Sequence, residues 1–255
     1  MSEEPASTSE GPVALRLPLR AHAPLVTYTI IGVTIAFYVL QQLSRIFFGY
    51  APFGMDWLEY FGARINSAIL AGQFWRLLTP ALLHGSILHI GFNMYALLSF
   101  GTLLEPLMGH KRFLALYLLS ALSGNVLSFL FSGGYSIGAS TAVFGLVIAE
   151  GVFFYRNRQL LGHQARQAIG NIVFIVIVNL FLGLSPGIDN WGHLGGLLGG
   201  LVFAWFAAPR YRVASATSAE GTFYTVEDEI GPGHVRFGAA LVLVFSLFLL
   251  LVKFI

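Results

Sequence analysis

Two residues of this sequence, Ser140 and His193, have side chains suited to nucleophilic catalysis. Serine is a weak nucleophile until a base accepts its proton, and histidine is the usual base near neutral pH. Ser140 lies in the run SIGASTAVFGL where one apolar stretch begins, and His193 lies beside GGLLGG where another begins. The two residues could therefore act as nucleophile and base if the fold brings these stretches together.

Three further polar residues, His84, His89 and Asn93, stand at the start of an earlier apolar stretch. His89 and Asn93 are four residues apart, which places both side chains on one face of a helix. An imidazole N–H, a carboxamide and the backbone N–H of Ser140 could stabilise the negative charge that develops on an attacked carbonyl oxygen. His84 suits a supporting position next to His89.

Each of these residues also has a simpler structural interpretation. A serine in a transmembrane helix most often packs against a neighbour or bonds back to a carbonyl one turn earlier. His193 alone could be a buried hydrogen-bonding residue between helices. Three histidines could bind a metal, but HGSILH lacks the glutamate and the histidine spacing of a zinc-protease helix, and only Asp189 offers a carboxylate near them. We therefore expect neither a metal nor a cofactor.

The composition predicts an all-α membrane protein. Of the 255 residues, 56% are hydrophobic and 10% are charged, which lies outside the balance of soluble domains. A membrane-spanning helix needs roughly 20 mostly apolar residues. The absence of cysteine excludes disulfides, thiolate catalysis and cysteine-ligated metals. Seven stretches are candidate spans: 25–46, 81–104, 112–131, 140–155, 168–184, 191–208 and 235–255.

The basic residues predict the orientation of these spans. In a membrane protein, an excess of Lys and Arg marks the loops on the cytoplasmic side. The basic residues of this sequence therefore report its topology and do not indicate nucleic-acid binding. If the N-terminus is cytoplasmic, most of them fall on the cytoplasmic side, and Arg45, Arg64, Arg76 and Lys253 fall outside. The second, fourth and sixth spans then begin near the outer face. Their polar residues share one depth, where intramembrane His and Asn are functional candidates.

The predicted organisation is one bundle with short additions. A six-helix core is followed by a linker, in which 214–233 is expected to be a flexible tether, and by a seventh helix. Glu105 is expected to pair with Lys111 or Arg112 in solvent. The predicted parts are a disordered cytoplasmic tail at 1–24, the core at 25–208, a cytoplasmic linker at 209–234 and the last helix at 235–255.

Small residues predict a close contact between the fourth and sixth spans. A small residue recurs every four positions along one face of GHLGGLLGGL, which lets helix backbones approach closely. Gly138, Ala139 and Ala142 give the fourth span a matching surface beside Ser140. This contact would bring Ser140 within reach of His193. The glycines of the sixth span are Gly192, Gly195, Gly196, Gly199 and Gly200.

At these residues the sequence resembles the rhomboid intramembrane serine proteases, from about residue 25 to 255. HGSILHIGFN resembles the family's His-x4-His-x3-Asn motif, which implies oxyanion stabilisation by His89 and Asn93 and a structural position for His84. GAS at 138–140 resembles the Gly-x-Ser turn, which implies Ser140 as nucleophile. GHLGGLLGG resembles the His-x2-Gly-x3-Gly motif, which implies His193 as base and Gly196 and Gly200 as contact residues.

The resemblance extends to the first outer loop and has one departure. FWR is similar to the family's Trp-Arg signature, which implies structural positions for Trp75 and Arg76. The family usually has glycine after the nucleophile, and Thr141 stands there instead. A β-branched residue is bulkier and stiffer, so we expect Thr141 to narrow the pocket beside Ser140 and to alter specificity or rate.

These observations predict a rhomboid-like six-helix bundle plus a seventh C-terminal transmembrane helix, acting as an intramembrane serine endopeptidase through a Ser140–His193 dyad. Transmembrane protein substrates would enter laterally from the lipid, near the outer face of a bacterial plasma membrane. The alternative is a non-catalytic rhomboid-like protein that binds transmembrane helices. A channel would need polar residues continuing inward, and below this layer the fourth and sixth spans are apolar apart from Glu150.

Overall fold

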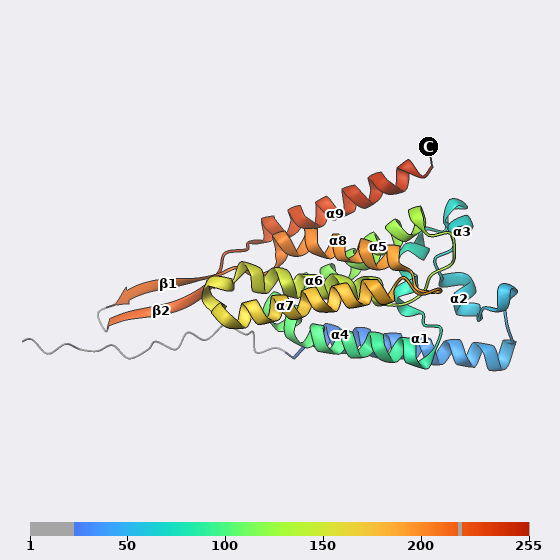
Figure 1. The fold of residues 1–255 in the computed structure, drawn as a ribbon, viewed down its shortest axis with the longest axis horizontal. Coiled ribbons are helices and arrows are strands. Elements are labelled where there is room, and N and C mark those ends of the chain that lie inside the picture. Colours follow the sequence, from blue (N-terminus) through green and yellow to red (C-terminus); the bar gives the residue numbers. More distant parts are fainter. Residues whose placement is uncertain (1–22, 219–220, 255) are drawn as a thin grey trace, which may run out of the picture.

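The structure, a computed structural model, describes residues 23–218 and 221–254 and shows an elongated bundle of roughly aligned helices (Figure 1). Most of the predicted tail lies outside the described residues. The long helices are α1 (Leu25–Phe48), α4 (Ile87–Met108), α5 (His110–Phe131), α6 (Ser140–Arg156), α7 (Arg158–Leu182), α8 (Asn190–Ala207) and α9 (Pro232–Val252). The shorter elements are η1 (Pro52–Gly54), α2 (Trp57–Gly62), α3 (Asn66–Leu70), η2 (Phe74–Leu77), η3 (Thr79–Leu82), β1 (Tyr211–Ser218) and β2 (Gly221–Asp228).

Five of the described helices, α1, α4, α5, α7 and α9, are long and apolar enough to cross a membrane. The other two predicted spans correspond to α6 and α8, which are shorter, with 17 and 18 residues. Length and composition therefore identify five of the seven predicted crossings, and the number seven stays a prediction.

Two predicted spans have different starting points in the structure. The second was expected from residue 81, but the chain forms η3 around Pro80, and α4 begins only after Ser86. The Ser86 hydroxyl caps α4 by accepting the N–H of His89 at 3.2 Å. The fifth was expected from residue 168, but α7 begins at Arg158 and is kinked at Gly162, whose φ is +51°, so that polar residues precede its apolar part.

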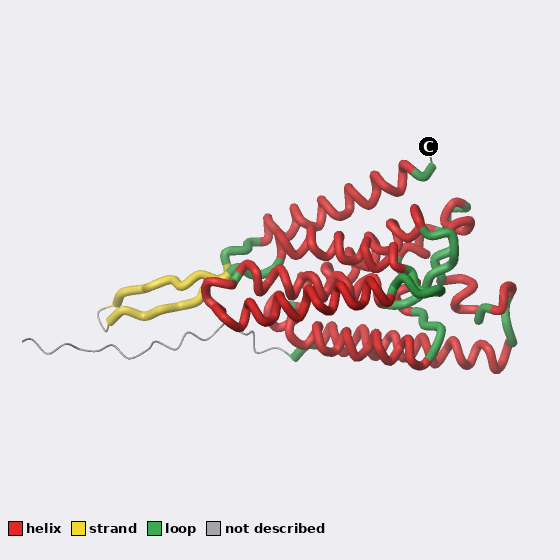
Figure 2. Tube along the Cα trace, in the orientation of Figure 1, coloured by secondary structure: helices red, strands yellow, loops and turns green. Residues whose placement is uncertain are grey.

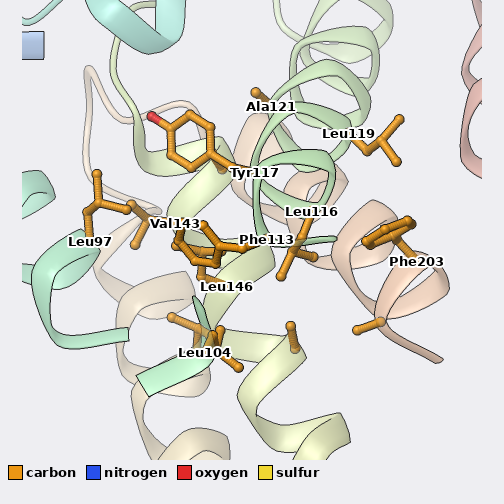
Figure 3. Close-up of a cluster of buried hydrophobic side chains, with 14 of the residues drawn as sticks. Leu97, Leu104, Phe113, Leu116, Tyr117, Leu119, Ala121, Val143, Leu146 and Phe203 are labelled. Atoms are coloured by element: carbon orange, nitrogen blue, oxygen red, sulfur yellow. The ribbon is translucent and has the colours of Figure 1, made fainter. Parts of the chain in front are cut away.

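The core of the bundle lies where α4, α5, α6 and α8 meet. Fully buried side chains such as Leu97, Leu116, Leu146 and Phe203 pack together there (Figure 3). Beside this apolar cluster, α8 approaches its neighbours through glycines. Helices with small residues at the contact can bring their backbones together without a side chain between them.

The glycines of α8 form two rows that face different helices. A Cβ on Gly196 would overlap the carbonyl oxygen of Thr141 on α6, and one on Gly200 would overlap Gly145. A Cβ on Gly195 would lie 2.7 Å from the carbonyl oxygen of Ser123 on α5. The predicted close contact of the fourth and sixth spans is therefore present, but its centre lies at Thr141 and Gly145, one turn further along α6 than expected.

An antiparallel hairpin of β1 and β2 extends beyond the bundle between α8 and α9, at the end opposite α2 and α3 (Figures 1 and 2). Its register pairs Tyr211 with Asp228 and Val213 with Val226. The sequence led us to expect a flexible tether over most of these residues. The consecutive β-branched and aromatic residues TFYTV of β2 favour a strand, which explains the hairpin.

Glu105 is buried near the C-terminal end of α4, with 1% of its surface exposed. Its carboxylate accepts the backbone N–H groups of Val26 and Thr27, both at 2.8 Å, and it contacts His110. The expected solvent pairing with Lys111 or Arg112 is wrong, because the carboxylate caps the first turn of α1 instead. A carboxylate is favourable there, where helix N–H groups lack partners.

Candidate active site

Ser140 and His193 meet at one end of the bundle. Ser140 is the first residue of α6 and His193 lies in the first turn of α8. The Nε2 atom of His193 lies 2.9 Å from the Oγ atom of Ser140, which is hydrogen-bonding distance. The glycine contact between α6 and α8 places the two helices close enough for this bond. A base can accept the serine proton directly in this geometry.

The ring of His193 is held by stacking. It lies over the ring of Phe144, one turn further along α6, with 4.3 Å between the centroids and 16° between the planes. The Nδ1 atom of His193 is buried and has no hydrogen-bond partner among the described residues. The imidazole is thus oriented by Phe144 and Ser140, without a carboxylate bonded to its far nitrogen, as in a dyad and unlike a triad.

His89 of α4 lies against the turn that precedes Ser140. Gly138 in this turn has a φ of +125°, a conformation that favours glycine. A Cβ at Gly138 would lie 2.6 Å from His89 Nε2 and 3.7 Å from Ser140 Oγ. Glycine is therefore required at this position for two reasons. It adopts the positive φ, and it has no Cβ that would overlap the imidazole of His89.

Hydrogen-bond donors surround the space beside Ser140. Asn93 is buried on α4, and one of its amide hydrogens goes to the His89 carbonyl oxygen at 2.9 Å, which leaves a second amide hydrogen. The backbone N–H of Ser140 has no partner within α6, because it belongs to the first turn. With the imidazole of His89, these groups can face a developing oxyanion.

A cavity of about 750 Å³ joins these residues. Its walls come from α4, α6, α7 and α8, including Phe92, Val143 and Asn179, and its rim comes from the loops before α6 and α8. Two rim residues, Tyr135 and Ile188, expose about half of their surface, at 54% and 43%. The cavity is therefore open at the loop end of the bundle.

His84 lies in the loop before α4, so the prediction that it stands at the start of the helix is wrong. Its ring is edge-on to that of His89 at 4.9 Å, and its Nε2 accepts the backbone N–H of Ala139 at 3.3 Å. It is fully buried. His84 thus supports both His89 and the residue before Ser140.

Gln41 of α1, which the sequence analysis missed, fixes His84 in turn. Its side-chain oxygen accepts the backbone N–H of His84 at 3.0 Å, and its amide nitrogen donates to Asp56 at 2.8 Å. Asp56 and Glu59 also pair with Arg45. Burial raises the pKa of Glu59, and the negative charge of Asp56 raises it further. The signal in the sequence that could have identified Gln41 is a polar amide side chain inside an apolar stretch.

Trp75 and Arg76 lie in η2, in the segment between α1 and α4, and bond to backbone carbonyl groups of that segment. Arg76 is buried and donates to the carbonyl oxygens of Ala63 at 2.8 Å and Tyr60 at 2.7 Å. Trp75 is half-exposed, and its indole N–H donates to the carbonyl oxygen of Phe61 at 3.0 Å. Neither side chain lines the cavity around Ser140.

Thr141 does not narrow the pocket, contrary to the expectation from the sequence. Its side chain is buried and points away from the cavity, toward α5 and α8. A Cβ on Gly124 would lie 2.6 Å from the Thr141 Cβ, and one on Gly192 would lie 3.1 Å from its methyl group. The bulk of Thr141 is accommodated by these two glycines.

No group of three or more His, Asp or Glu side chains within residues 23–218 and 221–254 is arranged to hold a metal ion. The imidazoles of the site instead face Ser140 and the turn before it. The arrangement is suited to acyl transfer by a serine.

The chain is similar in sequence to known proteins over the part that carries these residues. The family model for the Rhomboid domain matches residues 71–210, which include all of the residues around the cavity that are named above. The chain is 40% identical over 183 residues to the Rhomboid protease GluP of Bacillus subtilis (strain 168), covering 71% of this chain and 34% of that protein.

Two eukaryotic proteins show similar identity. RHOMBOID-like protein 2 of Arabidopsis thaliana is 39% identical over 142 residues, covering 54% of this chain and 44% of that protein. Rhomboid-like protease 1 of Toxoplasma gondii is 37% identical over 147 residues, covering 56% and 50%. The chain thus spans half or less of the length of each of these relatives.

Proposed function

This chain belongs to the rhomboid family, and we propose that it is an intramembrane serine endopeptidase with Ser140 as nucleophile and His193 as general base and acid. It is an integral membrane protein, as its apolar helices and family indicate. The observation that carries the proposal is the 2.9 Å distance between Ser140 Oγ and His193 Nε2 in a cavity that His89 and Asn93 also line.

The reaction follows from these positions. Ser140 Oγ attacks the carbonyl carbon of a peptide bond while His193 takes its proton, and the tetrahedral oxyanion is held by the Ser140 N–H, His89 and Asn93. His193 then gives the proton to the leaving amine, and an acyl-enzyme remains. A water molecule that enters past the rim of the cavity attacks the ester and restores Ser140.

The substrate class is a transmembrane or juxtamembrane segment of a membrane protein. A substrate helix has its carbonyl groups bonded internally, so it must unwind locally before Ser140 can reach one. We propose entry from the lipid past α7, whose Asn179 lines the cavity. We propose that the N-terminus is cytoplasmic, because in this orientation the cavity opens to water outside the cell. We propose a bacterial plasma membrane as the location.

The test is covalent labelling of the detergent-solubilised protein by a fluorophosphonate, which reacts with activated serines. We expect labelling of the wild type and none of Ser140→Ala, with His193→Ala slowed by at least about 1,000-fold because the serine loses its base. A folded wild type that stays unlabelled would contradict the proposal and favour a protein that binds transmembrane helices without cutting them.

A further inference from the structure

Arg64, between α2 and α3, is a fully buried arginine, and it lies outside the motifs that identify the family. Burial lowers the pKa of its guanidinium, and the charge of Asp189 opposes this effect. A charged group is retained in such a place only when hydrogen bonds and an opposite charge compensate for its desolvation. The partners of Arg64 are therefore informative about what it does.

The first set of partners lies in the loop that leads to Ser140. The Nη2 atom of Arg64 donates to the carbonyl oxygen of Gly134 at 2.8 Å. The backbones of Arg64 and Ser136 exchange two hydrogen bonds, at 3.0 and 3.1 Å. Gly134 and Ser136 both line the cavity. Arg64 thus fixes the wall of the cavity four residues before the nucleophile.

The second partner lies before His193. The Nη2 atom of Arg64 is 3.9 Å from Asp189 Oδ2. Asp189 caps α8 by accepting the N–H of Gly192 at 3.0 Å, and its carbonyl oxygen accepts the N–H of His193 at 3.1 Å. The hydroxyl of Ser128 also bonds to this carboxylate. The start of the helix that carries the base is therefore tied to the same guanidinium.

A third partner holds the guanidinium itself in place. The Nη1 atom of Arg64 donates to the side-chain oxygen of Asn66 at 2.5 Å. The amide of Asn66 donates to the carbonyl oxygens of Phe129 at 3.1 Å and Ser132 at 3.0 Å, at the end of α5. The planar guanidinium has several N–H donors and can bond to all of these acceptors at once. A lysine ammonium cannot hold the same geometry.

We propose that Arg64 is a positioning residue for the hydrolysis proposed above, because it fixes the approaches to Ser140 and His193 from one buried point. The inference rests on that proposed function. Ser140 and His193 belong to different helices, and their hydrogen bond depends on both loops keeping their places. A displacement of about 1 Å in such a pair costs about 100-fold in rate.

The experiment measures fluorophosphonate labelling of Ser140 as two separate quantities, the rate constant at saturating probe and the final labelled fraction. Loss of folded protein lowers the labelled fraction but leaves the rate constant of the remaining molecules unchanged. Misplacement of Ser140 or His193 lowers the rate constant at full labelling. The two quantities therefore separate a positioning residue from one that only stabilises the fold.

Three variants carry the test. We expect Arg64→Gln to lower the rate constant by about 10- to 100-fold. Arg64→Lys should be slowed by about 3- to 10-fold, since it keeps the charge opposite Asp189 but loses the fork. The matched control is Arg112→Gln at the other end of the bundle, where Arg112 pairs with Asp228 at 2.9 Å and donates to the Ile230 carbonyl oxygen at 2.7 Å. Its rate constant should stay within about twofold.

The outcomes distinguish the two proposals. If the wild type is not labelled at Ser140, the proposed function fails. If the wild type is labelled and both Arg64 variants label at the wild-type rate constant, the positioning proposal is overturned, even if their labelled fraction is reduced. Should Arg64→Gln not fold, Arg64→Lys decides by the same measurement. Equal slowing of Arg112→Gln would also overturn it, because the effect would then not depend on contact with the site.

Discussion

The helices that carry Ser140 and His193 are packed differently from α7, although all three border the same cavity. Between α6 and α8 the backbones meet at Gly196 and Gly200, with no space for a methyl group. Along the 25 residues of α7 only Ala165 and Ile172 are buried, and a Cβ on Gly170 would have no neighbour within 4 Å. One side of the cavity is thus closed by direct contact between backbones, and the other is formed by a helix with few buried residues.

This difference separates two requirements of the proposed function. A hydrogen bond of 2.9 Å between two helices needs a fixed distance, and lipid provides no hydrophobic force that would press the helices together. Close packing of small residues supplies that constraint. A substrate helix that enters sideways needs a wall that can move, and α7 has few contacts to lose. Four predictions test the contrast.

The largest effect is expected from adding one methyl group to the tight contact. In Gly196→Ala the new Cβ would overlap the Thr141 carbonyl oxygen, which belongs to the backbone and cannot rotate away. We expect a loss of about 1 to 3 kcal/mol in stability and a fall of about 100-fold in the labelling rate constant of Ser140. Thermal unfolding in detergent and fluorophosphonate kinetics measure the two effects.

The same substitution on α7 is the matched comparison. Gly170→Ala adds its methyl group to open space, so we expect unchanged labelling and a thermal midpoint no lower than that of the wild type. Similar damage from both substitutions would break the contrast between a tight and a loose wall.

The next effect concerns α1, which is tied to the bundle by polar bonds at the end away from the cavity. Glu105→Ala removes the acceptor for the N–H groups of Val26 and Thr27. We expect a stability loss of about 1 to 3 kcal/mol from these unpaired groups, with the labelling rate constant of the folded protein unchanged. A slower rate constant would mean that α1 helps to fix the distance between α6 and α8.

A small effect is also expected at Thr141. Its buried hydroxyl has no hydrogen-bond partner among the described residues, and its methyl group fills the space beside Gly124 and Gly192. Thr141→Val keeps the shape and removes an unsatisfied polar group, so stability should stay the same or rise by less than about 1 kcal/mol. Labelling should be unchanged, and a strong loss would show that the hydroxyl acts in the cavity.

The positions of Ser140, His193, His89 and Asn93 could be predicted because they depend on helix periodicity and on depth in the membrane. Apolar stretches locate the helices, and the direction of each helix decides which ends meet. The glycine pattern added the contact between two of these helices. These features depend on residues that are close together in the sequence, or on the apolar interior of the membrane.

The loop network could not be predicted in the same way. Arg64, Asp189 and Gln41 are single polar residues with partners distant in the sequence: Arg64 and Asp189 are 125 positions apart, and Gln41 bonds to Asp56 and His84 over 15 and 43 positions. An arginine in an outer loop is usually solvated, so nothing in the sequence distinguishes the buried one. Thr141 was misjudged for a related reason. Its position after the proposed nucleophile suggests that its side chain lines the pocket, but a residue next to Ser140 on a helix points in another direction.

The length of α6 would set the depth at which a substrate is cut, if this helix crosses the membrane as the sequence predicts. Its 17 residues rise by about 26 Å, less than the roughly 30 Å of a typical hydrocarbon core. Arg156 ends the helix and anchors it by bonding to the carbonyl oxygen of Trp205. With Arg156 at one surface of such a core, Ser140 would lie a few ångströms below the other surface. Each 1.5 Å of extra bilayer thickness would then present a helical substrate shifted by about one residue, so acyl-chain length would help to select the bond that is cut.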